Sequence, residues 1–153
     1  MDLNLPRYTF RTKENLGKTL IFDGFRRRWV ALTPEEWVRQ NFVRYLIEEK
    51  HFPASLIAIE RSLRMNQRDF RTDIVLFSKS GSPLVVVECK APGIKISQLV
   101  FDQIARYNLD LRVSYLIVTN GLSHFCCRFD QQQLAYAFLP DIPEYKDLEV
   151  ISN

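Results

Sequence analysis

Residues 71–90 read RTDIVLFSKSGSPLVVVECK, and this stretch predicts how the chain folds. Its segments 74–77 and 84–87 are apolar at every position, a pattern typical of central strands covered on both faces. Ser80 and Gly81 stand between the two segments and favour a tight turn. The stretch therefore predicts a β-hairpin within a sheet that helices cover on both sides.

A symmetric register about this turn sets Phe77 opposite Leu84 and Asp73 opposite Glu88. Directly opposed residues project from the same face of a sheet, with Cβ atoms roughly 4.5–5.5 Å apart. Lys90 lies two residues beyond Glu88 and therefore shares its face. The register gathers two carboxylates and one ammonium group at the end of a buried hairpin.

Two opposed carboxylates destabilise a sheet unless a cation lies between them. Carboxylate oxygens with several retained waters are typical ligands of Mg²⁺, or of Mn²⁺ in its place. Lys90 beside such an ion would stabilise phosphate charge or hold the attacking water, which predicts phosphodiester hydrolysis. In the alternative interpretation, Glu88 and Lys90 form a plain ion pair at an exposed strand end and Asp73 is solvated. The apolar neighbours 85–87 argue against that, because lone charges are rare in buried strands.

The rest of the chain predicts two helices and further strands. Thr33 and Pro34 favour the start of a helix that runs to about Lys50, and Glu36 would complete a capping box there. A second helix is expected over 96–107. Asp23-Gly24 predicts an N-terminal hairpin. Further strands are expected over 28–32, 56–64, 114–119, 124–129 and 134–138, the last two at sheet edges.

These elements predict an α/β fold with a mixed β-sheet flanked by helices, in a single domain spanning 1–153. A hairpin extension is expected over 1–32 and the core over 33–140. The 153 residues are 46% hydrophobic and 25% charged, as in an ordinary globular protein. The three cysteines are expected to be reduced and mostly buried. The sequence shows no signal peptide and no membrane-length apolar segment, so we expect a cytoplasmic protein.

The charge is mildly basic, with 21 Lys and Arg against 18 Asp and Glu, a net charge of +3. This permits a nucleic-acid partner without requiring one. Basic stretches are usually solvated faces, but they are also the residues that contact phosphates. The candidate DNA-binding residues are Arg61, Arg64, Arg68, Arg71, Lys95 and Arg106.

The same residues resemble the PD-(D/E)xK nucleases. Asp73 followed after fourteen residues by Glu88-Cys89-Lys90 resembles their D…ExK core, and Gln103 with Tyr107 resembles the QxxxY element of their RecB-like branch. A closer likeness is to the N-terminal domain of type I restriction enzyme R subunits, over about residues 20–140. It rests on the segments 29–39 (WVALTPEEWVR), 71–75 (RTDIV) and 86–92 (VVECKAP).

The resemblance implies a restriction-endonuclease-like fold and Mg²⁺-dependent hydrolysis of DNA. It implies that Asp73 and Glu88 are metal ligands and that Lys90 is the positioned cation. Thr72 stands where the family name has proline, at a position that varies. No helicase or translocase motif fits in 153 residues, so the chain is either a fragment or a stand-alone relative. The implied partners are DNA, a motor/translocase or specificity subunit, and a second copy, because cutting both strands generally calls for two sites.

Some assignments stay open on sequence alone. Glu36 is either a helix cap or a metal ligand from the first helix. Gln103 and Tyr107 either line the cleft or are structural, with Tyr107 in the core and Gln103 capping a neighbouring backbone group. The alternatives to a nuclease are a non-catalytic DNA- or protein-binding module with the same fold, and a structural domain with incidental charges. The joint presence of Asp73, Glu88 and Lys90 favours catalysis.

Overall fold

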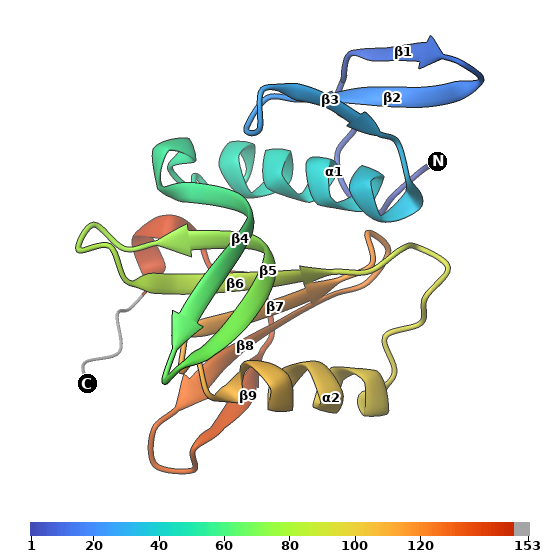
Figure 1. Ribbon diagram of the computed structural model, residues 1–153. Coiled ribbons are helices and arrows are strands. Elements are labelled where there is room, and N and C mark those ends of the chain that lie inside the picture. The colour runs from blue at the N-terminus through green and yellow to red at the C-terminus, as the bar shows by residue number, and fades with distance from the viewer. Residues whose placement is uncertain (149–153) are drawn as a thin grey trace.

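A six-stranded mixed sheet forms the centre of the protein, with helix α1 on one face and helix α2 on the other (Figure 1). The structure is a computed structural model and describes residues 1–148. The helices are α1 (Pro34–Glu48) and α2 (Gln98–Leu109), with short 3₁₀ turns η1 (Ala54–Leu56) and η2 (Tyr145–Asp147). The sheet consists of β4 (Ile57–Met65), β5 (Arg68–Phe77), β6 (Pro83–Cys89), β7 (Tyr115–Thr119), β8 (His124–Asp130) and β9 (Ala135–Leu139).

The strands lie side by side in chain order, and only the pair β6 and β7 is parallel. Helix α2 makes the crossover that a parallel pair needs. The predicted α/β class, with a mixed sheet between helices, is confirmed. The expectation that 124–129 is an edge strand is wrong, because β8 pairs with both β7 and β9. The edges are β4 and β9.

Alternation along the central strands divides the core into two layers. Ile74, Leu76 and Val85 pack in the cluster that contains the buried face of α1. Val75 and Val86 pack in the opposite cluster with Phe101 and Ile104 of α2. Consecutive apolar residues in β5 and β6 are thus required, because successive side chains point to opposite covered faces. None of the helices within residues 1–148 is long and apolar enough to cross a membrane.

The register of the β5–β6 hairpin is partly as predicted. Val75 faces Val86, which places the strands as the symmetric turn requires. Phe77 faces Pro83 rather than Leu84, because the register shifts between Leu76 and Phe77. The five-residue loop 78–82 causes the shift: the Ser78 N–H donates to the Ser82 carbonyl, and Gly81 adopts a φ of +90°. The deviation is confined to the turn, so the end of the hairpin that bears the carboxylates is not displaced.

The N-terminal extension is a three-stranded sheet, β1 (Thr12–Asn15), β2 (Lys18–Asp23) and β3 (Arg28–Ala31), and not a single hairpin. Strand β1 was missed because its residues, TKEN, are all polar and exposed. The turn at Asp23-Gly24 is a four-residue loop, 24–27, in which the Asp23 carboxylate accepts the Phe25 N–H at 2.8 Å. The assignment of 1–153 to one domain stays a prediction, and residues 149–153 lie outside the described residues.

Only one of the two hydrogen bonds of the predicted capping box forms at the start of helix α1. The Thr33 hydroxyl accepts the Glu36 N–H at 3.0 Å. The Glu36 carboxylate does not return to the Thr33 N–H, which donates to the Ala31 carbonyl instead. Glu36 binds Arg26, Arg39 and Gln40. Its interpretation as a cap is therefore wrong, and of the capping box only the Thr33 bond is present.

Removing the Thr33 hydroxyl is expected to lower the free energy of unfolding. Thr33→Ala loses one hydrogen bond to an otherwise unpaired helix N–H, a change that costs about 1 kcal/mol. Thr33→Ser keeps the capping oxygen and should retain the stability of the parent protein. Urea unfolding of the three proteins measures the difference. An equal loss in Thr33→Ser would contradict the cap.

Candidate functional site

A hollow of about 290 Å³ opens where β4, β5 and β6 pass the start of α1. Asp73 comes from β5, Glu88 from β6, and Glu35 from the first turn of α1. Its lining residues are Glu35, Glu60, Arg61, Ser62, Arg71, Thr72, Asp73 and Glu88. The two carboxylates that the sequence placed together therefore line one hollow.

Asp73 is tied to the neighbouring strand through its side chain. The β5–β6 ladder ends at the pair Ile74 and Val87, one residue before Asp73 and Glu88. In place of a further ladder bond, the Cys89 N–H donates to Asp73 Oδ2 at 2.7 Å. This bond fixes the direction of the carboxylate, whose second oxygen, Oδ1, lies 3.8 Å from Arg39 Nη1.

Both carboxylates resist ionisation. Burial raises the pKa of Asp73 above its ordinary value, against the opposing effect of the Cys89 N–H. Burial, and after it the charge of Asp73, raise the pKa of Glu88 to about 7. Glu35 adds to the rise in both pKa values. Two negative charges are thus held together in a poorly solvated place, as the hairpin register predicted.

Lys90 lies directly after β6 and partly compensates Glu88. Its Nζ is 3.5 Å from Glu88 Oε1. The ion pair of the alternative interpretation is therefore present, but the solvation that it assumed is not. The Asp73 and Glu88 side chains are only 19% and 24% exposed. The pair belongs to a buried charged site and not to a solvated strand end.

The acid of α1 that reaches the hollow is Glu35, and not the predicted Glu36. Glu36 is buried, and Arg26 and Arg39 occupy its carboxylate. Consecutive helical residues point about 100° apart, so the two glutamates cannot share one direction. The prediction that Glu36 is a metal ligand is therefore corrected. The acid of the first helix that lines the hollow is Glu35.

Arg39 is a site residue that the sequence did not reveal. Its Nη1 lies 2.8 Å from Glu60 Oε1 and 3.8 Å from Asp73 Oδ1. No local pattern identified Arg39, since its acidic neighbours Glu60 and Asp73 are 21 and 34 residues away along the chain. Its position on α1, three residues after Glu36, was the only available signal.

The donor set at the hollow fits a hard divalent cation. Within the described residues, no three His, Cys, Asp or Glu side chains form a set that could hold a metal ion. Two carboxylates, Asp73 and Glu88, are nevertheless sufficient for Mg²⁺, which is usually bound through one or two carboxylates and keeps several waters. Burial is the largest cause of their raised pKa values, so neither carboxylate has the solvation that its charge needs. The residues present therefore fit Mg²⁺ or Mn²⁺.

The two residues of the QxxxY element, both on α2, differ in their contacts. The Arg71 N–H donates to the Tyr107 hydroxyl at 3.4 Å, and the Tyr107 ring contacts Phe70 with centroids 5.4 Å apart. Tyr107 therefore lies beside a residue that lines the hollow, and at 38% exposure it is not the core residue of the structural interpretation. Gln103 is exposed, and its side chain makes no hydrogen bond within residues 1–148. It neither lines the hollow nor caps a backbone group.

The six candidate DNA-binding residues are all exposed, but only two line the hollow. These are Arg61 and Arg71. Arg64 pairs with Asp69 at 3.1 Å, and Arg68 pairs with Asp110 at 3.0 Å. The remaining two, Lys95 and Arg106, lie in the loop before α2 and on α2. Arg61 and Arg71 are thus the two candidates that lie next to the carboxylates.

All three cysteines are buried and free. Cys89 contributes its backbone N–H to the site, and burial raises the pKa of its thiol far above the ordinary value. This agrees with the expectation of reduced, buried residues. The thiol itself takes no part in the hollow.

Comparisons with known proteins identify relatives of this domain. The family model for the type I restriction enzyme R protein N terminus (HSDR_N) matches residues 34–143. A comparison with curated proteins finds no match. Among solved structures, the chain is similar to a fragment described as an HsdR subunit of a type I restriction enzyme from Vibrio vulnificus YJ016. That match has a TM-score of 0.52 and 21% identity, covering 76% of this chain and 24% of the other. The chain thus spans about a quarter of that protein's length, and the likeness shows the fold.

Proposed function

The chain belongs to the family of type I restriction enzyme R protein N termini, and on that premise we propose that it is a Mg²⁺-dependent DNA endonuclease domain. The observation that carries the proposal is the pair Asp73 and Glu88. Both carboxylates are mostly buried, both have raised pKa values, and both line an open hollow beside Lys90. Such a pair destabilises the protein unless a cation or a substrate uses it. The D…ExK and QxxxY assignments are part of this proposal.

Each residue at the hollow has its own role in the proposed hydrolysis of phosphodiesters. Asp73 and Glu88 would hold the ion, and the Cys89 N–H keeps Asp73 oriented toward it. A bound Mg²⁺ supplies Lewis acidity and a water of lowered pKa. Lys90 places an ammonium group where negative charge develops on the phosphate. Arg61 and Arg71, on the rim, hold the DNA backbone through its phosphates.

The partners proposed for the domain follow from the same premise. DNA is the substrate, and motor/translocase or specificity subunits of a restriction complex are the protein partners. A second copy would supply the second cut of a duplex. The competing assignment, a non-catalytic DNA- or protein-binding module of the same fold, differs in one measurable respect, since it binds without hydrolysis.

Cleavage of supercoiled plasmid and of single-stranded DNA tests the proposal. The purified protein is expected to nick DNA in Mg²⁺ or Mn²⁺ and not in EDTA. Lys90→Ala and Asp73→Asn should each lower the rate at least about 100-fold, since the lost charge stabilisation is worth several kcal/mol. Asp69→Asn is the matched control, because Asp69 is an exposed acid on the same strand outside the hollow.

If no cleavage is observed, calorimetric titration with Mn²⁺ distinguishes a protein that binds the metal without cleaving DNA from one that has no metal site. The parent protein and Lys90→Ala should bind Mn²⁺, and Asp73→Asn should not. Absence of Mn²⁺ binding by the parent protein would remove the metal site and, with it, the proposed reaction. Binding of DNA without cleavage in any metal would support the non-catalytic module instead.

A further inference from the structure

The N-terminal sheet, outside the matched residues 34–143, has one face with a distinctive composition. The register pairs Lys13 with Leu20 and Phe22 with Trp29, and side chains alternate between faces. One face therefore presents the set Arg11, Lys13, Lys18, Phe22 and Trp29, which we name the cationic aromatic face. The acids of the sheet, Glu14 and Asp23, belong to the other face, which carries the buried Ile21. Three exposed cations thus stand beside two half-buried rings with no carboxylate among them.

The cations already lie over the rings. Lys13 Nζ is 4.4 Å from the Trp29 ring centroid, and the Arg11 guanidinium is 4.9 Å from that of Phe22. Such contacts at exposed sites are worth about 0.5–1 kcal/mol. Stacking of a nucleobase on an aromatic side chain is worth about 1–3 kcal/mol. A base can therefore displace Lys13 from Trp29, and the freed ammonium group then meets the phosphate of the same nucleotide.

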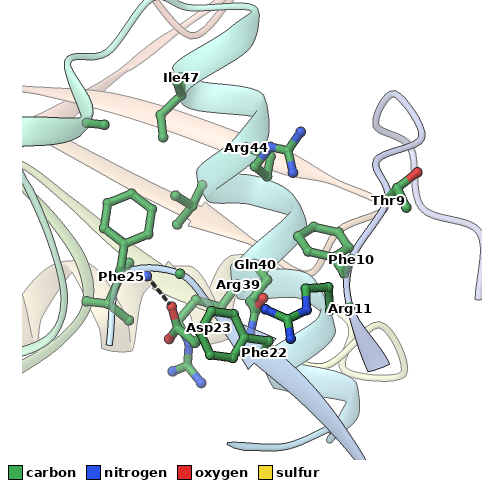
Figure 2. A pocket seen from close by; sticks show the side chains of 14 residues that line it. Thr9, Phe10, Arg11, Phe22, Asp23, Phe25, Arg39, Gln40, Arg44 and Ile47 are labelled. Carbon is green, nitrogen blue, oxygen red and sulfur yellow. Dashed lines mark hydrogen bonds between the residues drawn. The ribbon is translucent and has the colours of Figure 1, made fainter. Parts of the chain in front are cut away.

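An apolar hollow of about 470 Å³ continues from this face toward α1. Its volume lies within the range of small-ligand sites, roughly 300–1,000 Å³. Figure 2 shows the rings of Phe10, Phe22 and Phe25 around it, with Arg11 between Phe10 and Phe22. Arg11 and Phe22 line the hollow and also belong to the cationic aromatic face. A strand lying on the face can therefore place one unstacked base in the hollow.

Arg39, a residue that borders the hollow, carries a buried polar atom without a partner within residues 1–148. Arg39 lines the hollow, and its side chain is only 7% exposed. Its Nε–H is buried and has no hydrogen-bond partner among the described residues. A buried donor without an acceptor costs about 1–3 kcal/mol.

We propose that the cationic aromatic face and the adjoining hollow bind single-stranded DNA, with the phosphates on Arg11, Lys13 and Lys18 and one unstacked base in the hollow. Stacked bases of a duplex present neither a free ring face nor a base that can enter the hollow, which favours the single strand. The inference goes beyond the proposed cleavage, since binding here requires neither Asp73 nor Glu88. Arg39 connects the two places, because its Nη1 lies 3.8 Å from Asp73 Oδ1.

Fluorescence anisotropy with a labelled dT12 strand and a 12-base-pair duplex, in EDTA and low salt, tests the proposal. The parent protein should bind dT12 more tightly than the duplex. Trp29→Ala should weaken dT12 binding about 5- to 100-fold, and Trp29→Phe should restore most of it. Arg11→Ala combined with Lys13→Ala should reduce the salt slope by about 1.4, as expected for two phosphate contacts on a single strand. Lys79→Ala combined with Lys146→Ala removes the same charge elsewhere and should change nothing.

The hollow is tested separately with a matched pair of variants. Ala54→Trp fills the hollow from its exposed margin, whereas the neighbouring Ser55→Trp lies outside its lining. Only Ala54→Trp should weaken dT12 binding. Thermal unfolding verifies that each variant folds. Failure of the parent protein to bind dT12, equal affinity for the duplex, or an unchanged affinity in folded Trp29→Ala would overturn the inference. Cleavage that still depends on Asp73 would leave the proposed function intact in each of these cases.

Discussion

Glu88→Gln is expected to abolish metal-dependent cleavage and, in the same protein, to raise the free energy of unfolding at alkaline pH. The amide keeps the size and shape of the side chain, removes its charge and replaces one accepting oxygen by an N–H donor group. A neutral oxygen at this position is a poor ligand for a hard divalent ion, so the cleavage rate should fall at least about 100-fold. The same change relieves Asp73 of a neighbouring charge in a poorly solvated hollow.

The gain in stability depends on pH in a defined direction. The folded-state pKa of Glu88 is raised from 4.5 to about 7, so the folded protein binds the proton more tightly than the unfolded chain. The carboxyl is therefore tolerated at acidic pH, and its cost to stability builds up as the pH rises from about 4.5 through 7. At pH 8 the ionised Glu88 lowers the free energy of unfolding by roughly 3 kcal/mol at most. Glu88→Gln should recover less than this, because the variant also loses the ion pair with Lys90. Near pH 4 the cost vanishes.

Urea unfolding at pH 8 and near pH 4, with EDTA present, measures this difference. Glu88→Gln should exceed the parent protein at pH 8 and match it at the acidic pH. Glu49→Gln, which neutralises an exposed glutamate far from the hollow, is the control and should show no such pH dependence. A variant that cleaves DNA at the parental rate, or that is less stable than the parent at pH 8, would contradict the interpretation. Loss of activity with a gain in stability is the signature of a functional charge pair.

The central hairpin and its carboxylates could be predicted because local rules determine them. Runs of apolar residues mark covered strands, and the period of two places Asp73 beside Glu88 once the turn is located. A one-residue error in the turn would have reversed the faces. The actual irregularity, between Leu76 and Phe77, did not propagate, because the five-residue loop absorbed it.

The remaining site residues could not be predicted because they depend on contacts distant in sequence. Glu36 has the spacing of a capping glutamate, yet Arg26 and Arg39 bind it. The choice between Glu35 and Glu36 depends on how α1 is rotated over the sheet, which no local pattern gives. Strand β1 lacks an apolar residue and exists only because β2 offers it an edge. Gln103 had the right spacing on α2 but is exposed and does not line the hollow.

Arg26→Met is expected to be the most destabilising single substitution among the charged residues discussed. The Arg26 side chain is 15% exposed and binds Asp23, Glu36 and Glu60, and the Asp23 and Glu36 side chains are each 4% exposed. Glu36 keeps Arg39 and Gln40 as partners when Arg26 is removed. Asp23 is left with backbone N–H donors and no cation from this network.

A buried charge that loses its partner costs about 3–5 kcal/mol, a large part of the 5–15 kcal/mol that stabilises a typical domain. Urea unfolding of Arg26→Met measures the loss, and Arg28→Met, an exposed arginine two residues later, is the control. Adding Asp23→Asn to Arg26→Met should recover part of the stability, because the orphaned charge is then absent. If the double variant were no more stable than Arg26→Met, the cost would not lie in the unpaired Asp23. Since Arg26 comes from the β2–β3 loop and Glu36 and Glu60 from α1 and β4, the same result would show that this network fastens the N-terminal sheet to the core.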